Sequence, residues 1–137
     1  MEIKQDFKRI KRATATALVL SALLLAFVCT APQLIMHSLS DEVRPMLDDA
    51  REAVLRGEPE KALREICTAN ELITNKRELL MLFFDHSAVF TLEEAAESVE
   101  RLATVGDVEQ LLTELTGIET ELEYMLHLNA AEVHNLF

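Results

Sequence analysis

The stretch GEPEKALREI at Gly57–Ile66 recurs in altered form as GDVEQLLTEL at Gly106–Leu115, an offset of 49 residues. Each copy places a glycine and an acidic residue directly before an amphipathic run. Glycine ends a helix readily because it adopts the left-handed conformation, whereas acidic residues and proline suit the first turn of the next helix. Each copy therefore predicts a tight turn between two helices, and the chain is expected to contain two similar helix pairs.

Hydrophobic residues at helical spacing extend outward from both turns. They predict helices over residues 40–56, 59–86 and 91–105, and a fourth helix from Asp107 to a break near Asn129. No segment shows the alternation of a half-buried strand, so the expected fold class is all-α. Two helix pairs pack as an antiparallel four-helix bundle or as a short repeat stack, and two repeats are few for a stack. We therefore expect an antiparallel four-helix bundle built from two helical hairpins.

Three local signals refine the expected helix boundaries. Thr91 with Glu94 has the spacing of a capping box at the start of the third helix, and Asn129 with Glu132 has the spacing of a second one. Pro45 lies near the expected start of the first helix, where proline is tolerated or leaves a kink. The run LLMLFF at residues 79–84 is apolar on all sides of a helix, so it is expected to be buried on several sides.

The stretch ATATALVLSALLLAFVCTA at Ala13–Ala31 contains no charged residue. Its length is close to the roughly 20 residues that cross the hydrocarbon core of a bilayer, and apolar residues resume after Pro32. A cleaved signal peptide is the alternative, although proline directly after the cut makes a poor cleavage site. We expect a cytoplasmic basic tail at 1–12, a transmembrane helix at 13–36 and an extracytoplasmic helical domain at 38–137.

Charge sets the expected orientation. Residues 1–12 carry five basic and two acidic residues, a net charge of +3, whereas residues 38–137 carry eight basic and 22 acidic residues, a net charge of −14. Basic residues flanking a membrane helix stay in the cytoplasm, which predicts a single-pass protein of the cell membrane with its N-terminus inside. The acidic domain repels phosphate backbones, so nucleic-acid binding is not expected. The short cytoplasmic tail favours action through a partner.

The two cysteines predict no internal disulfide. Cys29 lies in the apolar stretch and Cys67 in the acidic domain, so one chain with this topology cannot bring them together. A disulfide between two chains through Cys67 stays open.

The stretch LFFDHS at residues 82–87 contains the main chemical candidates. Asp85, His86 and Ser87 have a structural interpretation, in which the imidazole donates to the last carbonyls of the second helix and the oxygens accept from the following turn. In the alternative, residues from several helices form a polar cluster that binds a small ligand or a metal. That cluster gathers Asp85, His86, Ser87, Glu97, His127, Glu132 and His134. No catalytic or cofactor-binding motif is present, so no enzyme and no cofactor are expected.

Four segments together resemble a known family. They are GEPEKAL (57–63), LFFDHS (82–87), ESVERL (97–102) and the ending HNLF (134–137). With the basic N-terminus and the apolar stretch, they resemble domain-of-unknown-function family 4363, small bacterial proteins with a single membrane helix and a helical domain. The chain departs from the family pattern by lacking a tryptophan in the second helix. The resemblance implies no activity, but it implies genes beside membrane proteins of the YetF type and hence a membrane partner.

The function expected from these features is a membrane-anchored helical interaction module. It would be an accessory subunit or scaffold for another membrane or envelope protein, bound to the bilayer and to that partner. The alternative is an extracytoplasmic bundle that binds a small ligand or a metal.

Overall fold

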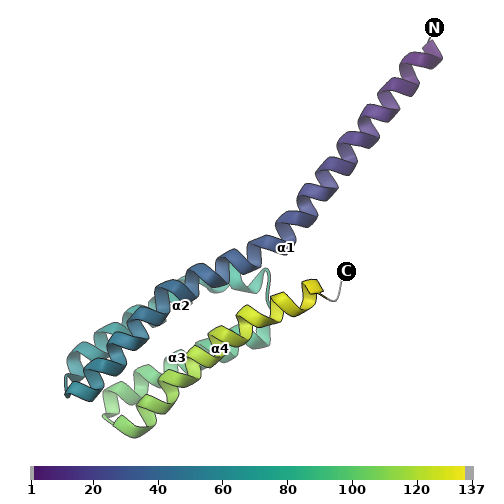
Figure 1. The fold of residues 1–137 in the computed structure, drawn as a ribbon. Helices are drawn as coiled ribbons and strands as arrows, with labels where there is room; N and C mark the ends of the chain where they lie inside the picture. The colour runs from purple at the N-terminus through teal and green to yellow at the C-terminus, as the bar shows by residue number, and fades with distance from the viewer. Residues whose placement is uncertain (1, 135–137) are drawn as a thin grey trace. The chain divides into compact units, whose positions relative to one another are not determined.

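The computed structural model describes the backbone of residues 2–134 and the side chains of residues 12–128. It contains four helices: α1 (Glu2–Arg56), α2 (Pro59–Met81), α3 (His86–Val105) and α4 (Val108–His134) (Figure 1). Between residues 2 and 134 there is no strand. The all-α fold class predicted from the sequence is therefore confirmed.

The chain divides into two compact units, Met1–Ala31 and Pro32–Phe137. Most of the described side chains of the first unit are apolar and exposed, including Leu20, Leu24 and Phe27. By length and composition, α1 can cross a membrane, and only a small share of its most apolar window is buried. A helix from the core of a soluble domain would be mostly buried instead.

The second unit is a helical bundle with one core. Every helix contributes fully buried side chains to it, such as Leu47, Ile73, Leu92 and Leu122. The turns at Gly57 and Gly106 lie at one end of the bundle, where they line a common groove. The α2–α3 turn lies at the other end, beside Tyr124 and Leu128 of α4 (Figure 1).

The internal repeat extends through the core. Residues 49 positions apart are buried together along both helix pairs. The buried pairs include Leu39 and Ala88, Val43 and Leu92, Leu47 and Ala96, Ala50 and Val99, Ala62 and Leu111, Ile66 and Leu115, Ala69 and Ile118, and Ile73 and Leu122. The same helix positions therefore face the core in both helix pairs, although residue size differs within several of the pairs.

Both glycine turns have the conformation predicted from the sequence. Gly57 has φ +74° and Gly106 has φ +83°, a region that side chains with a Cβ rarely adopt. The amide of Glu58 donates to the carbonyl of Ala53 at 2.8 Å, and the amide of Gly106 donates to that of Leu102 at 2.9 Å. These bonds satisfy the last carbonyls of α1 and α3 and reverse the chain within two residues.

Several predicted helix boundaries were wrong. The bundle part of α1 does not start at Ser40, because the helix is continuous from Glu2 and contains Pro45 in its interior. Helix α2 ends at Met81 and not at His86, and α3 begins at His86 and not at Thr91. The Thr91 hydroxyl donates to the carbonyl of Ser87 inside α3 instead of capping it. Helix α4 continues through Asn129, whose side chain lies outside the described residues.

The cause of the shifted α2–α3 boundary is a stronger cap closer to α2. Phe84 leaves the helix and enters the core, where it is buried beside the fully buried Leu80. Asp85 then stops the chain from continuing as helix, because its short carboxylate satisfies a free amide of α3. The prediction that all of LLMLFF is buried was therefore wrong for Leu79 and Leu82, which are exposed.

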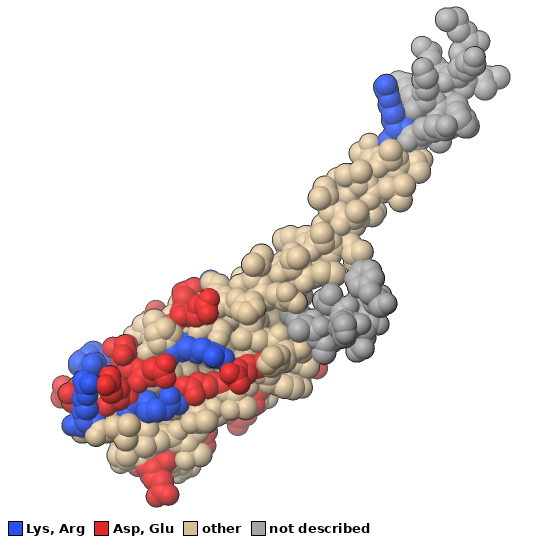
Figure 2. All heavy atoms as spheres, in the orientation of Figure 1, with Lys and Arg blue, Asp and Glu red and all other residues tan. Residues whose placement is uncertain are grey.

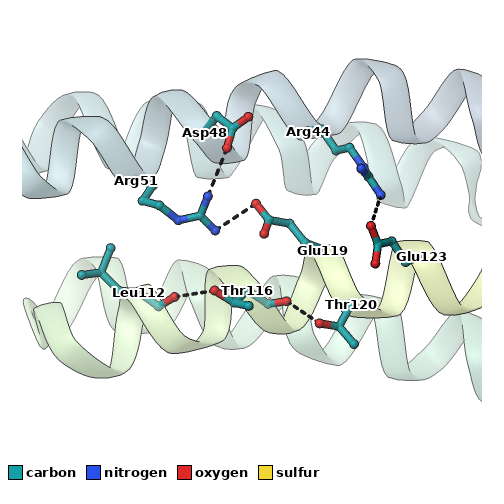
Figure 3. Close-up of polar contacts among 8 residues, drawn as sticks. All are labelled: Arg44, Asp48, Arg51, Leu112, Thr116, Glu119, Thr120 and Glu123. Carbon is teal, nitrogen blue, oxygen red and sulfur yellow. Dashed lines mark hydrogen bonds and ion pairs between the residues drawn. The ribbon is translucent and has the colours of Figure 1, made fainter.

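Ion pairs join α1 to α4 (Figure 3). Arg44 binds Glu123 at 2.9 Å, and Arg51 binds both Glu119 at 2.9 Å and Asp48 at 3.1 Å. Figure 2 shows acidic and basic side chains intermingled on one face of the bundle, as these pairs require.

Candidate functional site

The LFFDHS segment forms the turn between α2 and α3. Asp85 is the N-cap of α3, and its Oδ1 accepts a hydrogen bond from the amide of Ser87 at 2.9 Å. The amide of Phe84 donates to the carbonyl of Leu80 at 2.9 Å and so closes the last turn of α2. The structural interpretation of Asp85 is thus confirmed. The position expected for His86 was wrong, because this residue starts α3 and does not end α2.

Replacing Asp85 by alanine is expected to lower the free energy of unfolding by about 0.5–2 kcal/mol, the usual cost of losing an N-cap. Denaturant unfolding of the full chain in detergent measures this difference. Asp85→Asn is the matched control, because asparagine caps as well as aspartate and should retain most of the stability. Equal losses in both variants would show that the carboxylate acts through its charge and not through the cap.

The other candidate residues are distributed over α3 and α4. His86 and Ser87 are exposed in the first turn of α3, Glu97 is exposed on a later turn of α3, and His127 is exposed on α4. The side chains of Glu132 and His134 lie outside the described residues. Within residues 12–128, no three His, Cys, Asp or Glu side chains are grouped closely enough to hold a metal ion. The described part of the predicted cluster therefore does not form a ligand set.

Two of the candidates do share a cleft. Its volume is about 630 Å³, and it lies between the α2–α3 turn, the start of α3 and the last described turns of α4. The residues that line it are Phe83, Phe84, Asp85, Ser87, Ala88, Thr91, Thr120, Glu121, Tyr124 and Leu128. The cleft combines two carboxylates with hydroxyl groups and aromatic rings, a lining suited to a cationic or hydrogen-bonding ligand.

Sequence reasoning missed the α4 side of this cleft. Thr120 and Tyr124 are four residues apart, so they share one face of α4, and Glu121 adjoins them. These positions lie beside the apolar stripe that was used to predict the helix, and the Thr120 hydroxyl donates to the carbonyl of Thr116 (Figure 3). The sequence signal for this side of the cleft was the spacing of Thr120 and Tyr124, which places a hydroxyl and an aromatic ring on one face of α4, next to its apolar stripe.

Arg77 connects α2 to α3. Its Nε lies 3.3 Å from Glu93 Oε1, and its guanidinium carbon lies 5.4 Å from the centre of the Phe90 ring. Arg77 therefore forms an ion pair with another helix, with a cation–π contact beside it.

Cys67 lies half-buried on α2, close to Glu100 of α3. Burial, followed by the negative charge of Glu100 and a hydrogen bond to that carboxylate, raises the pKa of the Cys67 thiol. The side-chain amide of Asn70 donates to the same carboxylate at 2.5 Å. The thiol is therefore held in its protonated form, which is the unreactive form in alkylation and disulfide exchange.

In a Cys29→Ser background, alkylation of Cys67 is expected to become fast only at higher pH than for a free cysteine. Because Glu100 disfavours the thiolate, Glu100→Gln should move the pH–rate curve toward lower pH. Maleimide kinetics across pH measure the shift. Glu97→Gln, one turn earlier on α3, is the control and should leave the curve in place. If Glu100→Gln gives the same pH–rate curve as the parent protein, Glu100 does not contribute to the raised pKa of Cys67.

Comparison with known proteins gave no relative. No family model matches the chain, and neither a curated protein nor a solved structure matches it significantly. The resemblance to domain-of-unknown-function family 4363 therefore stays a prediction.

Proposed function

We propose that the chain is a membrane-anchored interaction module that serves as an accessory subunit or scaffold for another membrane or envelope protein. The observation that carries this role is an apolar groove of about 360 Å³ at the glycine-turn end of the bundle. Val54, Pro59, Ala62, Val108 and Leu111 are among its lining residues. An apolar groove with exposed apolar neighbours is the type of surface that binds a protein segment.

Exposed apolar side chains lie close in sequence to the two glycines that line the groove. Val105, which precedes Gly106, is 78% exposed, and Leu55, two residues before Gly57, is 69% exposed. Each lies next to a glycine turn whose conformation is fixed by the hydrogen bonds described above. The surface is thus presented on a rigid scaffold, which lowers the entropic cost of binding a partner.

The membrane half of the proposal rests on α1. Its charge-free, exposed segment at 13–31 follows five basic residues, and basic flanks are retained in the cytoplasm. On this basis the N-terminus is cytoplasmic, the protein crosses the membrane once and the acidic bundle is extracytoplasmic. The partner is then a protein reached from that side of the membrane, and a YetF-type membrane protein is the candidate that the family resemblance suggests.

For the bundle itself we favour the antiparallel arrangement of two hairpins. The ion pairs support it, because Arg44 pairs with Glu123 whereas Arg51, further along α1, pairs with the earlier residue Glu119 of α4. Residue numbers that rise on one helix and fall on the other indicate opposite directions.

Orientation is tested by labelling single cysteines in intact cells with a membrane-impermeant maleimide, in a Cys29→Ser, Cys67→Ser background. The proposal predicts that Val105→Cys reacts in intact cells and that Gln5→Cys reacts only after permeabilisation. The reverse pattern would place the bundle in the cytoplasm.

The partner role is tested with a photoreactive residue at position 105 of the full chain, followed by mass spectrometry of the cross-linked species. A membrane or envelope protein is expected, and Leu55→Asp should abolish the cross-link because a charge in the apolar surface must be desolvated. Thr116→Asp is the matched control, since it adds the same charge at an exposed position of α4 that does not line the groove. Loss of the cross-link in both variants would indicate a general effect of the added charge and contradict the proposal.

A second candidate function is binding of a small cationic ligand, favoured by the 630 Å³ cleft and its carboxylates. A ligand that binds only the folded state raises the melting temperature. A screen of organic cations against the full chain tests this, and Tyr124→Ala should remove any stabilisation found. An unchanged melting temperature with all cations would leave the cleft without this function.

A further inference from the structure

The α2–α3 turn exposes large apolar side chains that the bundle does not use. Phe84 and Leu80 fill the core, but Leu82 at the tip of the turn is 76% exposed. Leu79, three residues earlier on α2, is also exposed. Isolated exposed leucines are common, but apolar residues gathered at the tip of a turn often mark a contact surface.

The position of this turn in the fold limits what can cover it. Figure 1 shows this turn at the end of the bundle where α1 enters, and Met36 is the first residue of α1 in the core. Only five peptide units separate Met36 from Ala31, the last residue of the charge-free stretch. Five residues span at most roughly 18 Å, however the two units are oriented. If the charge-free stretch crosses a bilayer, this end of the bundle is held next to the lipid surface.

The residues of the turn favour lipid binding by insertion of apolar side chains and not by attraction between charges. Glu78 and Asp85 flank the exposed leucines, and the Arg77 guanidinium is already placed between Phe90 and Glu93. Attraction to anionic headgroups is therefore weak, whereas leucine and phenylalanine side chains enter the boundary between headgroups and acyl chains readily. Binding by insertion persists in zwitterionic lipid and at high salt.

We infer that the α2–α3 turn is a second membrane contact, in which Leu82 and Leu79 enter the headgroup–acyl boundary of the bilayer that α1 crosses. This inference rests on the proposed membrane anchoring. The contact attaches the bundle to the membrane at a second point, at the end opposite the glycine-turn groove.

The absence of tryptophan from the chain makes a direct test possible. Single tryptophans are introduced at Leu82, at Val105 and at Leu24 of the full chain, and each variant is reconstituted into phosphatidylcholine vesicles with brominated acyl chains. Leu82→Trp should emit at shorter wavelength than Val105→Trp, and bromine should quench it at least about twofold more strongly, because a side chain at the acyl boundary meets the quencher. High salt should leave the difference unchanged.

The outcomes separate this inference from the proposed anchoring. Strong quenching of Leu24→Trp together with none at Leu82→Trp overturns the lipid contact and leaves the anchor intact. No quenching of Leu24→Trp overturns the anchor and the contact together. A blue-shifted Leu82→Trp that bromine does not quench means that protein covers the turn, which also overturns the inference. If Leu82→Trp perturbs folding, Leu79→Trp replaces it.

Discussion

Replacing Leu47 by alanine is expected to lower the free energy of unfolding by about 2–5 kcal/mol. Leu47 is 0% exposed and lies in the middle of the core on α1. The loss has two parts, the transfer energy of the removed methyl and methylene groups and the cavity that they leave. Denaturant unfolding of the full chain in detergent, followed by far-UV circular dichroism, measures the difference.

Leu55→Ala is the matched control for this substitution. Leu55 lies two turns further along α1 and is largely exposed, so the same chemical change should cost at most about 0.5 kcal/mol. Similar losses at both positions would show that the core does not enclose Leu47 as described, and would argue against the packing of α1 in the bundle.

The second large effect is expected in the membrane segment. Leu20 and Leu24 lie one helical turn apart near the middle of the charge-free stretch, and both are exposed. Arginine at the centre of a membrane helix costs about 2.5–3.5 kcal/mol on the insertion scale, whereas leucine contributes favourably. The double variant Leu20→Arg, Leu24→Arg should therefore lose roughly 6–8 kcal/mol of insertion free energy and appear in the alkaline-soluble fraction.

The control for this experiment is Leu20→Ile, Leu24→Ile, which keeps the segment apolar and should stay in the membrane pellet. Retention of the arginine variant in the pellet after alkaline extraction would mean that α1 does not cross the bilayer as proposed. Loss of the isoleucine variant would point to a sequence-specific defect and not to hydrophobicity. These fractions are measured on cell membranes, so they do not depend on purification.

Most of the α-helical fold is predictable from the sequence because its signals are local. A glycine with positive φ and the acidic residue after it define each of the two helix–helix turns without reference to the rest of the chain. The periodicity that ends in Leu122 and Met125 likewise marks the buried face of α4. Asp107 was predicted as the N-cap of α4, and its Oδ1 accepts from the amide of Gln110 at 3.1 Å.

The α2–α3 boundary was not predictable in the same way, because two caps compete there. Thr91 has the better sequence signature, but the cap at Asp85 allows Phe84 to enter the core. The gain from burying an aromatic side chain depends on the helices around it. Propensity and spacing alone therefore place the start of α3 five residues too late.

The candidate site, too, was only partly predictable from the sequence. The cap formed by Asp85 could be predicted, because its partner is two residues away. The cleft could not, because half of its lining comes from Thr120, Glu121 and Tyr124, more than thirty residues along the chain from Asp85. The ion pairs of Arg44 and Arg51 with α4 could not be predicted for the same reason, because Arg44 lies 79 residues from Glu123 and Arg51 lies 68 residues from Glu119.

The sequence by itself determined the helical class, the two glycine turns, the repeat at an offset of 49 residues and the apolar, charge-free segment. Each depends on residues within a few turns of one another, where backbone preference and periodicity decide the outcome. Only the tertiary structure decided where α2 ends, which carboxylates pair with Arg44 and Arg51, and that Leu82 is left exposed. Those features depend on contacts between distant segments, whose free energy is set by the packing of the whole bundle.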